Sequence, residues 1–401
     1  MNAGNRKENS GSSGRRKNRP MHKLTFHPLG NADSTRIDLE NGSKILIDYA
    51  DMRDPLDSKD KRIDLPKELR ADLKKFKKDN FDVVVFTHLD RDHINRASEF
   101  FEFDYAAKYQ GGERVKMPMM WVPAAAILEE ACDGDAAVIQ KEAKHRLREN
   151  YGVRVFSSPG MLDKWFRDNK IKPAERAHLI TNAGETVKGF SLEKDGVEFF
   201  CHSPFATRTA DGTLFDRNKD SIALHITFRS GGVDSRALFL SDLTYDVIAD
   251  IVKVTEWHAK KDKSRLARLM WDIQKISHHC SYTALSDDKG KEKTKPDEMV
   301  DRLFRHYGQK HGVIVSTSKP IPSDDSDVQP PHRQAASYYR EVVQDEFREF
   351  KVTMETPSKT SPAPLVIKID QFGVTPEKAM LLGASSIASS PAPRAGDGRG
   401  V

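Results

Sequence analysis

Short apolar runs separated by polar turns dominate the first hundred residues of the chain. Three of them are typical of β-strands: residues 22–28, 35–39 and 44–49. The Asn41-Gly42 dipeptide between the last two is a strong hairpin signal. Apolar residues then recur at helical spacing over residues 66–78, and a β-branched run follows at residues 83–86. An antiparallel sheet followed by a helix and a further strand predicts an α/β layered domain.

The same alternation of strand and helix patterns continues to about residue 370. We expect further strands at residues 117–122, 189–192, 197–202, 221–228, 236–240, 271–276, 313–318 and 364–369. We expect helices at residues 95–103, 124–147, 245–253, 299–307 and 334–347. Residues 1–20 and residues from 376 onward lack periodicity and are rich in small and polar residues or proline. We therefore expect disordered tails at 1–20 and 376–401, on either side of one domain at residues 21–375.

Length and composition limit the class of protein. A chain of 401 residues has ample material for a core, and no apolar run reaches the length needed to cross a bilayer. The basic N-terminal residues have no apolar segment behind them, so they are not typical of a secretory signal. The three cysteines, Cys132, Cys201 and Cys280, form no C-x-x-C pair. This pattern favours a cytoplasmic protein and argues against a disulfide framework or a thiolate zinc site.

The net charge of +5 is concentrated in one short segment. Residues 1–20 contain six basic residues and one acidic residue, Glu8, so they alone carry a net charge of +5. The remaining 381 residues therefore balance to zero. The overall charge does not argue for nucleic-acid binding, and only a local basic patch would do so.

A dense group of metal-binding side chains follows the β-branched run at 83–86: His88, Asp90, Asp92 and His93. Imidazole and carboxylate groups hold zinc, manganese or iron in proteins. His88 and Asp90 are two residues apart and point the same way in extended backbone, whereas Asp92 and His93 are adjacent and diverge. One loop therefore has the donors to begin a site for two ions. The alternative is an ordinary polar loop in which Asp90 or Asp92 caps the next helix.

Two later positions repeat the pattern of an apolar strand followed by metal-binding side chains. Asp242 follows the predicted strand at 236–240, and His278 and His279 follow the one at 271–276. Strand ends can converge on one edge of a layered sheet, and the two oxygens of the Asp242 carboxylate suit it to a bridging position. Ions bound there would lower the pKa of water from about 15.7 toward about 7, which supports hydrolysis.

In this order the motifs resemble the metallo-β-lactamase fold superfamily, most closely its ComEC-like branch, the hydrolase domain of bacterial DNA-uptake proteins and free-standing relatives. The matching segments are G-N-A-D-S at 30–34, I-D-Y-A at 47–50, T-H-L-D-R-D-H at 87–93, S-D at 241–242 and H-H-C-S at 278–281. The resemblance covers about residues 22–345. It implies a four-layer αβ/βα sandwich with two divalent ions, Zn²⁺ or alternatively Mn²⁺, at one edge.

The resemblance also implies roles for individual residues. The predicted metal ligands are His88, Asp90, Asp92, His93, Asp242, His278 and His279. His88 and Asp90 would bind a first ion, which His278 or His279 would complete. Asp92 and His93 would serve a second ion, and Asp92 would also position the attacking water as the catalytic residue. Asp242 would bridge the two ions.

Five further residues are predicted to surround the ligands or the substrate. The resemblance places Asn218, Ser316 and His332 near the substrate. Asp33 and Asp48 are candidate partners of the ligating histidines, with ordinary turn and strand-end carboxylates as the alternative.

The chain departs from the resemblance in two ways. Four turn positions that carry glycine in the branch are Ala32, Ala50, Ser241 and Cys280 here, and Cys280 would place a thiol beside the site. No motif supplies the third histidine that lactamases place before the bridging aspartate, although His202 lies in that interval. This absence argues against antibiotic hydrolysis.

Three hypotheses follow for the function. The first is a metal-dependent hydrolase of phosphodiesters in a nucleic acid or nucleotide. The second is a metal-dependent hydrolase of carboxylic esters, thioesters or lactones. The third is a non-catalytic module of the same fold that binds a partner or nucleic acid through its basic N-terminal segment. The resemblance favours the first hypothesis, but fold analogy alone does not identify a substrate.

Overall fold

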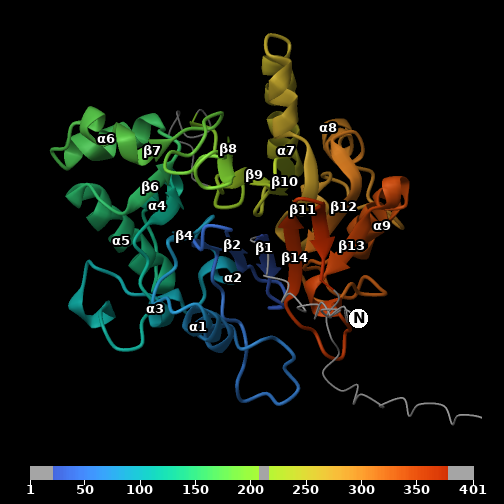
Figure 1. Ribbon diagram of the computed structural model, residues 1–401, viewed down its shortest axis with the longest axis horizontal. Coiled ribbons are helices and arrows are strands. Elements are labelled where there is room, and N and C mark those ends of the chain that lie inside the picture. Colours follow the sequence, from blue (N-terminus) through green and yellow to red (C-terminus); the bar gives the residue numbers. More distant parts are fainter. Residues whose placement is uncertain (1–20, 207–215, 378–401) are drawn as a thin grey trace, which may run out of the picture.

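The computed structural model describes residues 21–206 and 216–377. Residues 1–20, residues 207–215 of a polar loop and residues 378–401 lie outside the described residues, and they include most of the two predicted tails. The C-terminal tail was expected from residue 376, but Pro376 is the last residue of a strand. Two β-sheets face each other, and helices cover the outer surface of each sheet (Figure 1).

The first sheet has nine strands in the order β15-β14-β1-β2-β3-β4-β5-β6-β7. Its strands are β1 (His22–Phe26), β2 (Thr35–Asp38), β3 (Lys44–Ile47), β4 (Val83–Val85), β5 (Met120–Pro123), β6 (Val153–Phe156), β7 (Ile180–Thr181), β14 (Leu365–Asp370) and β15 (Gly373–Pro376). Strands β3 to β7 run parallel to one another, and the other neighbouring pairs are antiparallel.

The second sheet has six strands in the order β13-β12-β11-β10-β9-β8. Its strands are β8 (Val197–Ser203), β9 (Ala223–Ser230), β10 (Val233–Phe239), β11 (Trp271–Lys275), β12 (Gly308–Ser316) and β13 (Glu349–Val352). Strands β10 to β13 are parallel, whereas β8, β9 and β10 pair antiparallel.

The helices form the two outer layers. Those on the side of the first sheet are α1 (Leu65–Lys75), α2 (Arg91–Ile94), α3 (Ala97–Phe100), α4 (Ala124–Leu128), α5 (Gly134–Glu149) and α6 (Gly160–Asp168). Those on the side of the second sheet are α7 (Tyr245–Ala259), α8 (Glu298–Arg305) and α9 (Arg333–Val342). Figure 1 shows the first set in blue to green and the second in yellow to orange. The predicted four-layer αβ/βα sandwich is confirmed.

Three apolar clusters hold the layers together. The middle cluster lies between the sheets, where Phe26 of β1 and Phe239 of β10 stack with ring centroids 5.9 Å apart. The two outer clusters join each sheet to its helices, for example through Leu69 of α1 and Ile248 of α7. Every residue of β3 and β4 is buried. Because helices and the second sheet cover both faces of these parallel strands, they carry continuous apolar runs instead of alternation.

Several predicted elements differ in the structure. Of the helix expected at 95–103, only α3 is helical, and Arg96, whose φ is +62°, separates it from α2, which ends before residue 95. The helix expected at 124–147 is divided into α4 and α5, and residues 189–192 form turns instead of a strand. Strands β6, β7, β13 and β15 and helix α6 were not predicted, since strands of two to four residues and a helix of nine show too few repeats for a clear periodicity.

The carboxyl ends of the parallel strands meet at one edge of the sandwich. Asp48 follows β3, and residues 87–93 follow β4. On the second sheet, Asp242 follows β10 and His279 follows β11. Parallel strands place their carboxyl ends on the same side of a sheet, so residues far apart in the sequence converge there.

None of the helices in the described part of the chain has the length and apolar character needed to cross a membrane.

Candidate metal centre

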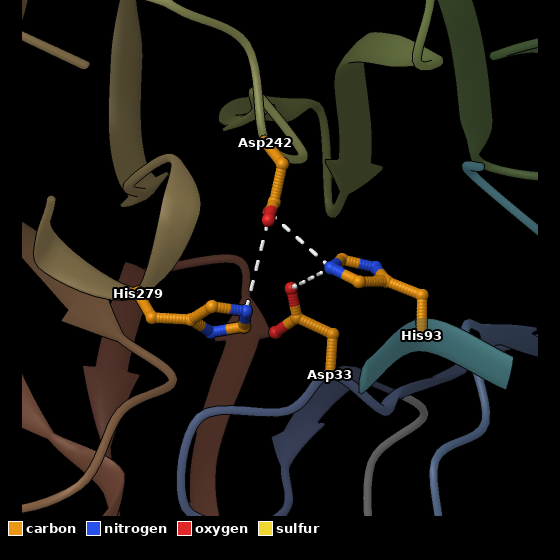
Figure 2. A group of neighbouring side chains, drawn as sticks. All are labelled: Asp33, His93, Asp242 and His279. Atoms are coloured by element: carbon orange, nitrogen blue, oxygen red, sulfur yellow. Dashed lines mark ion pairs between the residues drawn. The ribbon is translucent and has the colours of Figure 1, made fainter. Parts of the chain in front are cut away.

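Two overlapping groups of metal-binding side chains lie at this edge. Asp33, His93, Asp242 and His279 each offer a donor atom, and these atoms lie within 4.8 Å of one another (Figure 2). All four residues are buried. His88, Asp92 and His93 form a second group within the same distance limit. His93 belongs to both groups, so the arrangement has the form of two adjacent cation sites.

The orientation of His93 is set by Asp48 and Thr87. His93 Nδ1 lies 2.8 Å from Asp48 Oδ2, and the Asp48 carboxylate also accepts from the Thr87 backbone N–H (2.8 Å) and hydroxyl (2.7 Å). This leaves His93 Nε2 facing Asp242 Oδ1 at 3.3 Å and Asp33 Oδ2 at 3.5 Å. A carboxylate behind an imidazole is the usual arrangement for fixing a metal-binding histidine. Asp48 lies where the sequence placed it, beside a predicted ligand.

His279 is held in a similar way by a backbone carbonyl. Its Nδ1 donates to the Thr317 carbonyl at 2.7 Å, and its Nε2 lies 3.1 Å from Asp92 Oδ2 and 3.7 Å from Asp242 Oδ2. His279 therefore joins Asp92 and His93, although the sequence interpretation placed it or His278 with His88 and Asp90. The neighbouring His278 belongs to neither group, and its Nδ1 lies 3.4 Å from the Thr283 hydroxyl.

Asp242 lies between the two buried histidines, as Figure 2 shows. Burial would raise the pKa of its carboxyl, but His93 and His279 outweigh burial and lower this pKa well below its ordinary value. Burial would likewise lower the pKa of His93, but Asp242 and Asp48 outweigh it and raise this pKa well above its ordinary value. The Asp242 carboxylate is therefore ionised, which is the state in which a carboxylate binds a metal ion.

The turn that carries His279 has an uncommon backbone. His278, His279 and Cys280 have φ angles of +49°, +51° and +67°, and Ser241, beside Asp242, has a φ of +49°. Non-glycine residues in this region cost of order 1–3 kcal/mol each. Ser241 and Cys280 are two of the positions where the resemblance led us to expect glycine, and their positive φ angles give the physical reason for that expectation.

Lys275 is a member of the site that the sequence analysis missed. Its ammonium group forms an ion pair with Asp33, and both side chains are buried. Burial would lower the pKa of Lys275, but Asp33 and Asp242 outweigh it and raise this pKa. The available signal was a lysine near the end of the apolar strand before His278, because lysine is almost never fully buried without a partner. The same oxygen of Asp33, Oδ2, thus contacts both the Lys275 ammonium group and His93 Nε2.

His88 and Asp90 lie at the outer margin of the centre. His88 Nε2 is 3.5 Å from Asp90 Oδ2. The other Asp90 oxygen accepts from Arg217 at 3.0 Å, and Arg217 also pairs with Glu129. Asp90 is half-buried and belongs to neither group of converging donors. Asp90, a predicted ligand, therefore lies next to His88 and is held there by Arg217.

The three predicted substrate residues differ in their surroundings. Ser316 is buried at the end of β12, and its hydroxyl lies 2.8 Å from that of Ser318. Both ring nitrogens of His332 contact backbone groups: Nδ1 accepts from Tyr282 N–H at 3.3 Å, and Nε2 lies 3.1 Å from the Val328 carbonyl. Asn218 lies in a turn before β9, where its carbonyl accepts from Ser221 N–H. Their contact with a substrate stays a prediction.

The Cys280 thiol does not lie among the metal-binding donors, which corrects one expectation. The side chain is fully buried in the apolar cluster beneath α7, α8 and α9. Burial raises the pKa of this thiol. The positive φ of Cys280 turns its side chain into the outer helical layer, while the side chain of His279 points into the centre. Cys132, Cys201 and Cys280 are all free thiols.

His202 is also outside both groups of donors. Its Nε2 lies 2.8 Å from the carbonyl of Arg268, and its ring is buried near that of His225. This position at the edge strand β8 explains why it does not supply the missing third histidine. Burial lowers the pKa of the His202 imidazole to about 4.

Replacement of His202 by Gln is expected to reduce the acid sensitivity of the fold. An unfolded histidine binds a proton near pH 6.5, whereas buried His202 does so only near pH 4, so the folded state loses stability as the pH falls across this window. Urea unfolding at pH 7 and pH 5 should show a loss about 2 kcal/mol smaller in His202→Gln than in the wild type. His258→Gln, at an exposed position of α7, should behave like the wild type. An identical pH dependence in all three proteins would contradict the prediction.

The donor set fits a cation. Four buried atoms at the centre have no well-aligned hydrogen-bond partner among the described residues: Asp33 Oδ1, His88 Nε2, His93 Nε2 and Asp242 Oδ1. Leaving a buried polar atom unsatisfied costs roughly 1–3 kcal/mol. A divalent ion satisfies imidazole nitrogens and carboxylate oxygens together, and this mixed set suits zinc or manganese.

Comparison with known proteins gives only distant similarity. No family model and no curated protein matches the chain. Among solved structures, a diphosphatase of the PhnP family is 11% identical, with 87% of this chain and 98% of that chain covered and a TM-score of 0.30. Zn²⁺-bound PqqB from Methylobacterium extorquens is 12% identical, with 83% and 98% covered and a TM-score of 0.31. The metallo-β-lactamase GOB-18 from Elizabethkingia meningoseptica is 13% identical, with 77% and 97% covered and a TM-score of 0.30. These similarities are too distant to assign a reaction.

Proposed function

We propose that the chain is a metal-dependent hydrolase with a two-ion centre, a ComEC-like member of the metallo-β-lactamase superfamily that acts in the cytoplasm. The observation that carries this proposal is the buried convergence of Asp33, His93, Asp242 and His279, with three of their donor atoms left unsatisfied. A purely structural ion-pair network would satisfy its polar atoms internally. The centre instead offers free donor atoms on residues from both sheets.

The geometry supports a division of the ligands between two ions. His93, Asp92 and His279 would hold one ion, which we call the inner one. His279 Nε2 is 3.1 Å from Asp92 Oδ2. His88, with Asp90 beside it, would help to hold the other ion, which we call the outer one. Asp242 would act as the bridging carboxylate, because its two oxygens face His93 Nε2 at 3.3 Å and His279 Nε2 at 3.7 Å. His278 is left out of this assignment.

The chemistry is the activation of water. Divalent ions in such a centre lower the pKa of bound water toward about 7 and polarise the bond to be cleaved. The protein residues hold the reacting groups in place: Asp48 and the Thr317 carbonyl orient the two imidazoles, and Asp242 supplies negative charge between them. Asp92 is only partly buried and reaches the open side of the centre, where it can orient a water molecule or take its proton.

We propose a phosphodiester as the bond that is cleaved, in a nucleic acid or nucleotide. The support is electrostatic, because the open side of the centre borders a cavity with six cationic side chains. Such a surface favours an anionic substrate over a neutral ester or lactone. An enzyme that cleaves simple carboxylic esters but leaves bis-p-nitrophenyl phosphate intact would instead support the second hypothesis.

Metal analysis is the direct test of the centre. Protein purified without chelator should contain near two divalent ions per chain by mass spectrometry, with Zn²⁺ favoured over Mn²⁺. The double variant His88→Ala/Asp242→Ala should lose them, because it removes an outer ligand and the bridging carboxylate. The same sample should hydrolyse bis-p-nitrophenyl phosphate, and the variant should not.

The matched control is His258→Ala/Asp250→Ala, which removes an exposed histidine and an exposed aspartate from α7. It should retain both ions and full activity. If wild-type protein binds no metal even after reconstitution, the donors do not act as ligands, and the non-catalytic binding module becomes the better explanation.

A further inference from the structure

A basic cavity opens directly beside the candidate metal centre. It has a volume of about 810 Å³, and Asp92 contributes to its wall. This is in the upper part of the range of roughly 300–1,000 Å³ found for small-molecule sites. Five separate parts of the chain form it: the β1–β2 turn, the loop between β3 and α1, the start of α2, the segment after β12 and the segment after β13. Any substrate at Asp92 must also meet this surface.

The charge in the cavity is predominantly positive. Its cationic side chains are Lys59, Lys61, Arg62, Arg91, Lys319 and Lys359, and its carboxylates are Asp57, Asp60 and Asp92. Arg62 and Asp60 pair with each other at 2.6 Å, so they contribute little to an incoming ligand. Lys359 pairs with Glu355 at 3.1 Å. Residues 21–401 carry no net charge in total, so this is a local concentration of positive charge.

Four of these cations have no carboxylate partner in the described part of the chain: Lys59, Lys61, Arg91 and Lys319. Three of them are lysines that the fold brings together from loops almost 260 residues apart in the sequence. Among the described residues, the Lys61 ammonium group donates only to the Lys359 carbonyl and the Arg91 guanidinium only to the Asn95 side chain, so their charges are not neutralised. Exposed lysines are usually dispersed or paired with acids, so a set of cations without carboxylate partners around one cavity indicates an anionic ligand.

The loop that carries Lys319 is fixed by contacts across the centre. The Asn31 side chain accepts from Lys319 N–H at 2.9 Å and donates to the Pro330 carbonyl. The neighbouring Ile321 N–H donates to Glu355 at 2.9 Å. These contacts hold the backbone of Lys319 beside the β1–β2 turn. The cationic side chains therefore reach the cavity from more than one loop.

The remaining walls show what the cavity recognises. Its apolar lining comes from Leu29, Met52, Pro320 and Met354, and the described lining contains no aromatic ring. Proteins that bind single strands through their bases use aromatic side chains as stacking platforms. Lysine contacts to phosphates carry no sequence information. The cavity is therefore built for a phosphate backbone and not for particular bases.

We propose that this cavity binds the phosphates that flank the scissile bond in a nucleic-acid strand, and that Lys59, Lys61 and Lys319 are the residues that hold them. This inference rests on the proposed hydrolase function, because it places the scissile phosphodiester at Asp92. It goes further by naming a polymeric substrate, bound without sequence preference, and the residues that distinguish it from a small phosphodiester.

The test compares two triple variants of the full chain. Lys59→Gln/Lys61→Gln/Lys319→Gln removes the cavity charges. Lys141→Gln/Lys188→Gln/Lys253→Gln removes three exposed lysines on elements that do not line the cavity. Both variants lose the same charge and retain residues 1–20, so a contribution of that basic segment cancels in the comparison.

Binding is measured first, with chelator present, by the fluorescence anisotropy of a short labelled oligothymidylate over a range of salt concentrations. The cavity variant should bind at least about tenfold more weakly than the control variant. Each phosphate contact to a single strand contributes about 0.7 to the slope of log affinity against log salt, so the loss of three contacts should reduce that slope by about 2. Equal binding by the two variants would overturn the proposal.

Turnover is measured next, with metal present, on the oligonucleotide and on bis-p-nitrophenyl phosphate. The cavity variant should show a KM raised about tenfold on the oligonucleotide and a much smaller rise on the small diester, which carries one negative charge and has no flanking phosphates. A nucleoside triphosphate that competes as well as the oligonucleotide would overturn the polymer assignment.

The two levels of the proposal fail in different ways. Cavity-dependent binding without turnover would sink the hydrolase function and leave the binding surface intact. Turnover of the oligonucleotide at the same KM in both variants would support the hydrolase and refute the role of the cavity.

Discussion

Asp92→Asn is expected to abolish hydrolysis while the fold remains intact. The substitution keeps the shape of the side chain but removes the negative charge, so the residue can no longer take a proton from water or balance His279 at 3.1 Å. Loss of a positioned general base typically costs about 10²–10⁴-fold in rate, and loss of a metal ligand adds to this. Asp92 lies on the cavity wall and outside the apolar clusters, so the unfolding midpoint should change little.

The rate is measured on bis-p-nitrophenyl phosphate, and urea unfolding is monitored by circular dichroism. Asp250→Asn makes the same chemical change at an exposed position of α7 and should have wild-type activity. Full activity in Asp92→Asn would sink the proposed mechanism. A loss of activity accompanied by unfolding would show that Asp92 is a structural residue.

Lys275→Met is expected to have the largest effect on stability. Lys275 and Asp33 are a buried ion pair, with 4% and 3% of their side chains exposed. Removing one partner leaves an uncompensated buried charge, which typically costs about 3–5 kcal/mol. Methionine fills a similar volume, so the loss is electrostatic and does not come from a cavity. The free energy of unfolding should be measured with chelator present, because a bound cation would compensate the negative charge that Asp33 retains when Lys275 is removed.

A double-mutant cycle separates the pair from its surroundings. Lys275→Met/Asp33→Asn should be considerably more stable than the sum of the two single changes predicts, because it leaves no unpaired charge. The control is Lys116→Met, which removes a lysine from an exposed pair with Asp79 and should have little effect. Additive effects at Lys275 and Asp33 would contradict the coupling.

The Lys275 pair also bears on the metal centre. Its ammonium group brings a permanent positive charge next to Asp33 and near Asp242. Asp33, Asp48 and Asp242 place three carboxylates close together in a buried part of the protein. The lysine therefore stabilises the ionised carboxylates before any cation binds, and it keeps one oxygen of Asp33 from acting as a free ligand.

The layered architecture and most of the residues at the centre could be predicted from local patterns in the chain. Apolar runs followed at once by His88, Asp92, His93, Asp242 and His279 are local patterns, because a buried strand and the polar group at its end are neighbours in the chain. The parallel order of such strands then brings their ends to one edge. The αβ/βα sandwich predicted from the motifs is the one that the two sheets and their helices form.

Which of these side chains meet depends on long-range packing and could not be predicted from the chain alone. His278 and His279 are equivalent in the sequence, and three successive positive φ angles turn His279 toward Asp92. Arg217 holds Asp90 from a turn 127 residues away, and Lys275 holds Asp33 from a strand 242 residues away. The five segments of the basic cavity likewise come from both ends of the domain, at residues 29–92 and 319–359. Such long-range pairings depend on how the two sheets face each other, and this packing leaves no periodic pattern in the residues it brings together.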